Sequence, residues 1–212
     1  MNFLDEEIDK YVCEHTENEP QELYELNRET HLNVLIPRML SGHFQGRFLS
    51  MLSHMIQPKN VLEIGTYTGY SALCFAEGLQ KDGKIITIDK NDELEEIIEK
   101  YISKTNNQER IQFLKGDATD IIPNLNEEWD LVFIDADKTN YSNYFDLVID
   151  KMPSGGYIIA DNVLWSGKVV DAMANDADTA ALKEFNRKVH EDSRVQNVLL
   201  PIRDGLMILR KI

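Results

Sequence analysis

Residues 61–70 read VLEIGTYTGY, an apolar run that contains Glu63, breaks at Gly65 and meets a second glycine four positions later. The run is aliphatic and β-branched, as in a buried strand, and residues 71–79 (SALCFAEGL) then have a helical pattern. A strand, a glycine turn and a helix in this order are typical of the first unit of a nucleotide-binding α/β sheet. The stretch therefore predicts an α/β fold with a ligand at the glycine turn.

The residues around the turn indicate which ligand this is. A dinucleotide site has glycine at the middle position of G-x-G-x-x-G, where the backbone approaches a pyrophosphate, but this chain has Tyr67 there. The carboxylate of Glu63 suits a ligand with a cationic amino group better than one with two phosphates. S-adenosylmethionine fits that description. The alternative is a purely structural turn, because glycine turns after strands are common.

Length and composition limit the remaining possibilities. A chain of 212 residues accommodates one sizeable α/β domain, which we expect to span residues 1–212. The net charge of -15 disfavours nucleic acid as a partner. Cys13 and Cys74 have no pairing or metal-binding spacing, and the five histidines show no ligand-like pairing. Without a leader-like start or an apolar run near ~18 residues, a soluble cytoplasmic protein is expected.

The order of the patterned segments predicts the architecture. Residues 1–57 are polar and helical in pattern, which indicates an N-terminal helical cap, and residues 58–212 form the cofactor-binding core. In that core, strands alternate with helices, which implies a parallel sheet covered on both faces. Only residues 202–205 (IRDG) separate the last two strands, so these must be antiparallel neighbours. The expected strands are residues 61–65, 84–89, 111–116, 130–137, 156–161, 195–201 and 205–212.

Two strand ends carry candidate cofactor contacts. Asp89 ends the second strand about twenty residues after the glycine turn, where a carboxylate accepts hydrogen bonds from both ribose hydroxyls. Its alternative role is to cap the following turn. Asp117 and Ala118 follow the third strand, where they would reach the edge of the adenine.

Acidic and amide side chains follow the next two strands. Asp135, Asp137 and Lys138 come after the fourth strand, and Asp161 and Asn162 end the fifth. Oxygen ligands without thiolate or imidazole select a hard ion such as Mg²⁺. The alternative is a set of separate helix caps. Beside a metal, the pKa of Lys138 would be lowered, so this lysine is a candidate base, or else a surface charge.

Trp165 follows the second of these pairs. Its indole is either a flat apolar wall for a substrate ring or a core residue.

Residues from about 39 to 212 resemble the cation-dependent class I O-methyltransferases of the caffeoyl-CoA and catechol type. The resemblance rests on LEIGTYTGYSAL (62–73), IDKN (88–91), FIDADKTNY (133–141), DNVLWSGKVVD (161–171) and LPIRDGLMILRKI (200–212). It implies a Rossmann-like seven-stranded sheet in the order 3-2-1-4-5-7-6. It also implies S-adenosylmethionine as methyl donor, a divalent cation (Mg²⁺, or Mn²⁺ or Ca²⁺) and a homodimer.

The resemblance implies a role for individual residues. The metal ligands would be Asp135, Asp161 and Asn162, with Lys138 as proton acceptor and Asp135 touching both metal and cofactor. Lys138, Asp135 and Asn162 are thus the candidate catalytic residues, and Trp165 and Arg38 are the candidate substrate contacts. The candidate cofactor contacts are Met39, Ser41, Glu63, Gly65, Thr66, Tyr67, Ser71, Asp89, Lys90, Asp117, Ala118 and Asp135.

One departure bears on the substrate. Plant caffeoyl-CoA enzymes carry an arginine- and tyrosine-rich insertion after the tryptophan, whereas residues 169–182 here are the short acidic VVDAMANDADTAAL. We therefore expect a catechol-like small aromatic substrate and not a CoA ester.

Two other functions stay open. The first is methylation of a tRNA hydroxyuridine, for which a local basic rim is available in Arg28, His31, Arg38, His43 and Arg47. The second is a non-catalytic binding module, against which the intact metal and lysine positions speak.

Overall fold

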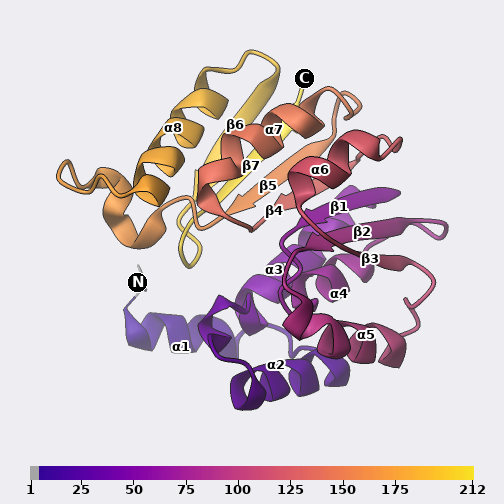
Figure 1. Cartoon of the computed structure of the whole chain (residues 1–212). Helices are drawn as coiled ribbons and strands as arrows, with labels where there is room; N and C mark the ends of the chain where they lie inside the picture. Colours follow the sequence, from indigo (N-terminus) through magenta and orange to yellow (C-terminus); the bar gives the residue numbers. More distant parts are fainter. Residues whose placement is uncertain (1–4) are drawn as a thin grey trace. The chain divides into compact units, whose positions relative to one another are not determined.

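The computed structural model describes residues 5–212, and their strands form one seven-stranded sheet in the order β3-β2-β1-β4-β5-β7-β6 (Figure 1). Strand β7 runs antiparallel to both of its neighbours. The expected sheet, its strand order and its antiparallel last strand are therefore confirmed. The strands are β1 (Asn60–Ile64), β2 (Lys84–Asp89), β3 (Ile111–Lys115), β4 (Leu131–Ile134), β5 (Tyr157–Asp161), β6 (Val195–Leu200) and β7 (Leu206–Lys211).

The segment before β1 is helical and contains no strand among its described residues, as expected for residues 1–57, of which 1–4 lie outside the described part. No helix in residues 5–212 is long and apolar enough to cross a membrane. The α-helices are α1 (Glu6–Glu14), α2 (Gln21–Asn33), α3 (Gly42–Ile56), α4 (Tyr70–Ala76), α5 (Glu95–Lys104), α6 (Ala118–Ile121), α7 (Tyr141–Ile149) and α8 (Ala177–Glu191). The 3₁₀ turns are η1 (Pro37–Met39), η2 (Asp92–Leu94), η3 (Ile122–Asn124), η4 (Lys138–Asn140) and η5 (Trp165–Val170).

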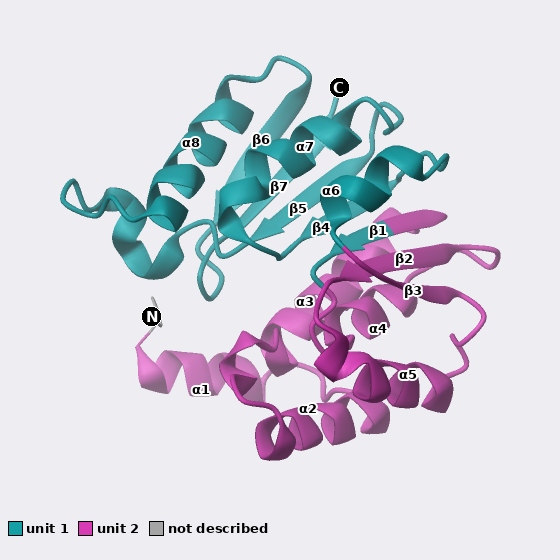
Figure 2. Cartoon of the chain, viewed as in Figure 1, with its two compact units in different colours: residues 1–3, 62–65, 117–212 teal, residues 4–61, 66–116 magenta. Residues whose placement is uncertain are grey.

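The described residues cluster into two compact units, which Figure 2 colours separately. Unit 1 contains residues 62–65 and 117–212, and unit 2 contains residues 5–61 and 66–116. Each unit has fully buried side chains, for example Trp129 and Phe185 in unit 1 and Leu49 and Phe75 in unit 2. This division does not test the expectation of a single domain over residues 1–212, which stays a prediction.

Strands β4 and β5 position the polar residues that follow them. All four residues of β4 are buried, as expected for a parallel strand covered on both faces. The register pairs Leu131 with Tyr157 and Ile134 with Ala160. Because the two strands are parallel and in step, the residues after Ile134 and Ala160 leave the sheet at the same edge.

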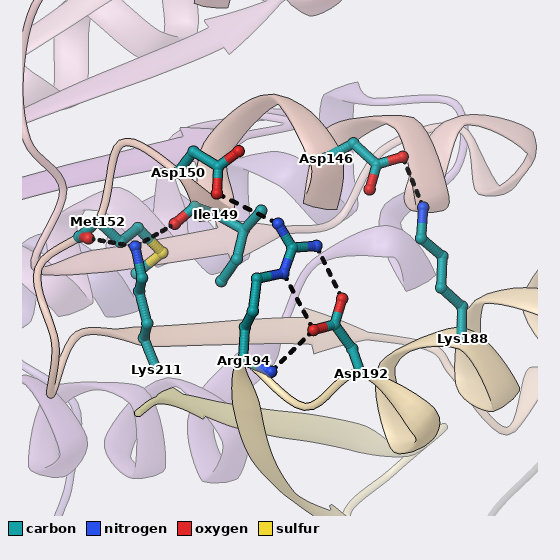
Figure 3. Close-up of polar contacts among 8 residues, drawn as sticks. All are labelled: Asp146, Ile149, Asp150, Met152, Lys188, Asp192, Arg194 and Lys211. Atoms are coloured by element: carbon teal, nitrogen blue, oxygen red, sulfur yellow. Dashed lines mark hydrogen bonds and ion pairs between the residues drawn. The ribbon is translucent and has the colours of Figure 1, made fainter.

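Charged side chains stabilise the C-terminal end of helix α7 (Figure 3). The ammonium of Lys211 donates to the carbonyls of Ile149 and Met152, each at 2.7 Å. Arg194 pairs with Asp150 at 3.2 Å and with its neighbour Asp192 at 2.7 Å. A cation at the carbonyl end of a helix satisfies unpaired acceptors and opposes the helix dipole. This cluster therefore stabilises α7, whose first residue lies near the candidate site.

Candidate functional site

The ends of β4 and β5 converge on the ammonium of Lys138. Its Nζ donates to Asp135 Oδ1 at 2.9 Å and to Asn162 Oδ1 at 2.8 Å. A third hydrogen bond, of 2.7 Å, goes to the hydroxyl of Tyr141. The structure thus brings together the three candidate catalytic residues, and it adds a tyrosine that the sequence analysis did not single out.

Lys138 is enclosed, with 8% of its surface exposed. Its Nζ lies 4.8 Å from the ring centroid of Tyr141 and 5.8 Å from that of Trp165. Burial lowers the pKa of Lys138, but the combined effect of Tyr141 and Asp135 outweighs burial and leaves the pKa raised. We expected a lowered pKa beside a metal, whereas the protein groups around Lys138 act in the opposite direction.

Asp161 and Asn162 form a tight corner at the end of β5. Asp161 is 3% exposed, and its Oδ1 accepts the backbone N–H of Asn162 at 2.6 Å. Asn162 has a φ of 59°, in the left-handed region that asparagine tolerates better than most residues. No group of three or more His, Cys, Asp or Glu side chains in residues 5–212 is placed to hold a metal. The expected ligand set contains only two carboxylates, because its third member is an amide.

Asp137 has a different role from Asp135. Its Oδ2 accepts a hydrogen bond from the amide of Asn140 and its Oδ1 accepts one from the hydroxyl of Tyr144, each at 2.5 Å. The carboxylate therefore fixes the turn between β4 and α7 through two side-chain partners, and it makes no capping hydrogen bond to the backbone of η4.

Trp165 lies in a strained loop that the turn between β6 and β7 holds. Trp165 and Ser166 both have positive φ, 47° and 54°. The side chain of Asp204 accepts a hydrogen bond from the backbone N–H of Ser166 at 2.5 Å. The backbone carbonyl of Asp204 accepts one from the N–H of Leu164 at 2.9 Å. Trp165 is half-buried, and its buried indole N–H has no partner among the described residues. Asp204, which the sequence analysis also missed, thus orients the loop of Trp165.

The acidic segment after this loop folds back onto α8. Lys183 of α8 donates to the carbonyls of Asp171 and Ala174 at 2.7 and 3.0 Å. Lys168 pairs with Asp176, which caps α8.

Unit 1 also holds part of the expected cofactor set. Glu63 is fully buried in β1. Gly65 has a φ of 98°, and a Cβ on it would lie 1.9 Å from the carbonyl oxygen of Asp135. Glycine is therefore required at this position. Asp117 caps α6 by accepting from the N–H and hydroxyl of Thr119, and Ala118 is buried behind it.

Unit 2 holds the carboxylate of Asp89 in a fixed orientation. Its Oδ2 accepts the backbone N–H of Tyr67 at 2.8 Å and its Oδ1 accepts that of Asn91 at 2.9 Å. Both oxygens keep further lone pairs, because a carboxylate has about four acceptor sites. Behind the turn, the hydroxyls of Thr66 and Thr87 are 2.5 Å apart. Asp89 thus caps the following turn, as its alternative role predicts, and its oxygens can still accept hydrogen bonds from a ribose.

The other candidate residues of unit 2 differ in exposure. Ser41 and Ser71 are buried, whereas Met39 is 55% exposed and both Arg38 and Lys90 are exposed.

One residue of the basic rim considered for a tRNA substrate, Arg47, is already paired with an acidic side chain. The partly buried side chain of Arg47 forms an ion pair with both carboxylate oxygens of Glu77, at 2.6 and 2.9 Å.

The chain is similar to known proteins over most of its length. A family model described as O-methyltransferase matches residues 13–212. A caffeoyl-CoA O-methyltransferase of Petroselinum crispum is 37% identical over 210 residues, covering 92% of this chain and 85% of that protein. A second one, from Nicotiana tabacum, is 36% identical over 208 residues, with 92% and 85% covered.

Solved structures show the same similarity. An SAH-bound methyltransferase of Podospora anserina has a TM-score of 0.90 at 27% identity, covering 99% of this chain and 97% of that one. An O-methyltransferase of Bacillus cereus in complex with SAH has a TM-score of 0.89 at 28% identity, with 97% of each chain covered.

Proposed function

Because the chain belongs to the O-methyltransferase family, we propose that it methylates one of two neighbouring hydroxyls on a catechol-like small aromatic, with a divalent cation as cofactor. S-adenosylmethionine is the methyl donor of the family. The observation that supports a cation is that Asp135 Oδ1 and Asn162 Oδ1 both accept hydrogen bonds from one charged nitrogen, Nζ of Lys138. Two oxygens that already share a positive charge suit a hard cation such as Mg²⁺, Mn²⁺ or Ca²⁺.

The donor would be held by residues with complementary chemistry. The buried carboxylate of Glu63 suits the cationic amino group, and Asp89 retains lone pairs for the ribose hydroxyls. The turn at Gly65 packs directly on the backbone of Asp135, where a side chain would clash, and this close packing would keep the turn in place beside the donor. Asp117 and Ala118 would serve the adenine. Met39, Ser41, Thr66, Tyr67, Ser71 and Lys90 complete the proposed cofactor set.

The cation would be held by Asp135, Asp161 and Asn162. A bound divalent cation supplies Lewis acidity, which lowers the pKa of a phenol that coordinates it. Of these three residues, Asp161 is held rigidly by the N–H of Asn162, and Asp135 and Asn162 are held by Lys138.

Lys138 would accept the phenolic proton. It can do so only as a neutral amine, so the base role requires that Asp135 and Asn162 stop stabilising its ammonium form. Trp165 would supply a flat wall for the ring, with Arg38 as a second acceptor contact. Because the methyl group is already activated, most of the rate should come from alignment, which can supply about 7–11 kcal/mol.

The acceptor is inferred from two features. The plant relatives are named for a caffeoyl ester, and a caffeoyl group carries a catechol ring. The acidic segment of residues 171–178, folded onto α8, is unsuited to the phosphates of coenzyme A. We therefore propose a small free catechol. A tRNA acceptor is the less favoured alternative, because Arg47, one of the five residues of the basic rim, is engaged with Glu77.

An acceptor panel tests this proposal. Catechols, hydroxycinnamates and undermodified tRNA would be incubated with the protein, Mg²⁺ and S-adenosylmethionine labelled in its methyl group. We expect label on the catechols, at one of the two hydroxyls. Transfer to the tRNA alone, with binding that weakens steeply as salt rises, would overturn the choice of acceptor.

Changing Lys138 to alanine tests the proposed base. Loss of a general base costs about 10²–10⁴-fold in turnover, and the affinity for the donor should stay nearly unchanged. Nitro-substituted catechols ionise without help, so the variant should recover part of its rate on them. If only the Michaelis constant of the acceptor rose, Lys138 would be a positioning charge and not the base.

A further inference from the structure

The ammonium of Lys138 has three N–H donors, and the structure supplies three acceptors for them. They are Asp135 Oδ1 at 2.9 Å, Asn162 Oδ1 at 2.8 Å and the hydroxyl of Tyr141 at 2.7 Å. The first two belong to the proposed cation ligands. Tyr141 is thus the one of these three partners that a cation would leave in place.

Tyr141 is rigidly fixed. It is the first residue of α7, has no exposed surface, and packs edge-to-face on Phe185, with ring centroids 5.4 Å apart. Its hydroxyl donates to the carbonyl of Asp161 at 2.9 Å. A phenol has one proton to donate, so its oxygen faces Lys138 as an acceptor. The hydroxyl therefore connects the lysine to the strand that carries Asp161.

We propose that Tyr141 is a positioning residue that retains the Lys138 side chain when a divalent cation takes over Asp135 and Asn162. This role rests on the proposed function, because it requires the cation. Two positive charges do not share the same two oxygens without strong repulsion, so the ammonium and the cation compete for them. A buried lysine nitrogen left without a partner is costly, and the hydroxyl of Tyr141 removes that cost because its oxygen accepts an N–H from the ammonium or from the neutral amine.

The competition predicts opposite effects for two substitutions. Lys138→Ala removes the competing charge, so the affinity for a divalent cation should rise. Tyr141→Phe removes the partner to which the lysine retreats, so the affinity should fall, by about 10-fold for a hydrogen bond to a charged group. In the Lys138→Ala background, Tyr141→Phe should change the affinity by less than about twofold, because its effect is exerted through Lys138.

The chain offers a matched control in Tyr144. It lies on the same helix, and its hydroxyl donates to Asp137, which we do not place among the cation ligands. Tyr144→Phe removes the same atom from the same type of residue. It should leave the affinity for the cation within about twofold of the parent.

The experiment is calorimetric titration of Mn²⁺ into the full chain, for the parent, the three single variants and the double variant. Methyl transfer to catechol supplies a second readout, in which Tyr141→Phe should lower turnover about 10- to 100-fold, as for other groups that orient a site residue. The Michaelis constant for S-adenosylmethionine should not change. A merely structural role would not produce this split, nor would its effect vanish in the absence of Lys138.

The outcomes separate the two proposals. If the parent binds Mn²⁺ and Tyr141→Phe binds it equally well, or loses as much affinity without Lys138 as with it, the role of Tyr141 is wrong and the proposed function stands. If the parent does not bind Mn²⁺, the proposed function fails and the role of Tyr141 fails with it. If Tyr141→Phe does not fold, Lys138→Ala still tests the proposal. If Lys138→Ala binds Mn²⁺ no more tightly than the parent does, the lysine and the cation do not compete and the role of Tyr141 is wrong.

Discussion

Replacing Gly65 with alanine tests how closely the turn after β1 packs against the end of β4. The φ of Gly65 is 98°, and an added Cβ would lie 1.9 Å from the carbonyl oxygen of Asp135 and 2.7 Å from its carbon. Real Cβ atoms essentially never approach another heavy atom within 3.0 Å. Since both contacted atoms are backbone atoms, the chain at residue 65 or 135 must move by about 1 Å, the difference between 1.9 and 3.0 Å.

Two contributions set the expected loss of stability. A left-handed conformation costs a residue with a Cβ about 1–2 kcal/mol. Forcing an extra carbon into a packed site costs about 1–3 kcal/mol more, so the free energy of unfolding should fall by about 2–5 kcal/mol. Gly69 is the matched control, because its φ is 85° and its nearest neighbour, Ile98 Cγ2, is 3.9 Å from an added Cβ. Gly69→Ala should therefore lose only the conformational contribution.

Urea unfolding of the two variants and the parent measures these losses, and calorimetry measures the affinity for S-adenosylmethionine. A displacement of about 1 Å at Asp135, which belongs to the proposed cofactor set, should weaken donor binding at least about 10-fold in Gly65→Ala, the cost of one hydrogen bond to a charged group. Equal destabilisation of Gly65→Ala and Gly69→Ala would show that the close approach to Asp135 is not a constraint, and the reasoning about the turn would be wrong.

Two other predictions concern the donor and helix α7. Asp89→Ala should weaken S-adenosylmethionine binding by about 1.5–3 kcal/mol, the value of hydrogen bonds to a charged group, and calorimetry should detect no NAD binding to the parent; an unchanged affinity would misplace the ribose. Lys211→Met should lower the free energy of unfolding by about 1–2 kcal/mol, because the carbonyls of Ile149 and Met152 lose their cationic partner. Its control, Lys10→Met, removes only an exposed pair with Glu14 and should cost less than about 0.5 kcal/mol; equal losses would contradict the capping role.

The sheet could be predicted because its signals are local. Buried runs such as residues 131–134 alternate with helical segments, and the short connection at residues 202–205 forces the last two strands to be antiparallel. The ends of helices depend on side-chain contacts that the sequence pattern does not show. Helix α7 spans Tyr141–Ile149, and the 3₁₀ turn before it is fixed by the hydrogen bond between Asp137 and Tyr144.

The candidate site divides in the same way. Asp135, Lys138 and Asn162 were expected at one edge of the sheet, and the hydrogen bonds among them agree with that expectation. The contribution of Tyr141 was missed, although it lies three residues after Lys138, which is one helical turn. Its role depends on the carbonyl of Asp161 and the ring of Phe185, which only the folded chain brings to it. Likewise, no sequence pattern predicts the hydrogen bond between Asp204 and Ser166 in the loop of Trp165.

The most direct test of the proposed cation is chelation during methyl transfer. Transfer of label from S-adenosylmethionine to catechol should stop in EDTA and return with Mg²⁺ or Mn²⁺, while calorimetry shows that donor binding largely survives the chelator. Asp161→Ala should not regain activity when the cation is restored, because a ligand is missing. Full activity of the parent in excess EDTA, or of Asp161→Ala with or without a cation, would contradict the proposal that Asp135, Asp161 and Asn162 hold a catalytic ion.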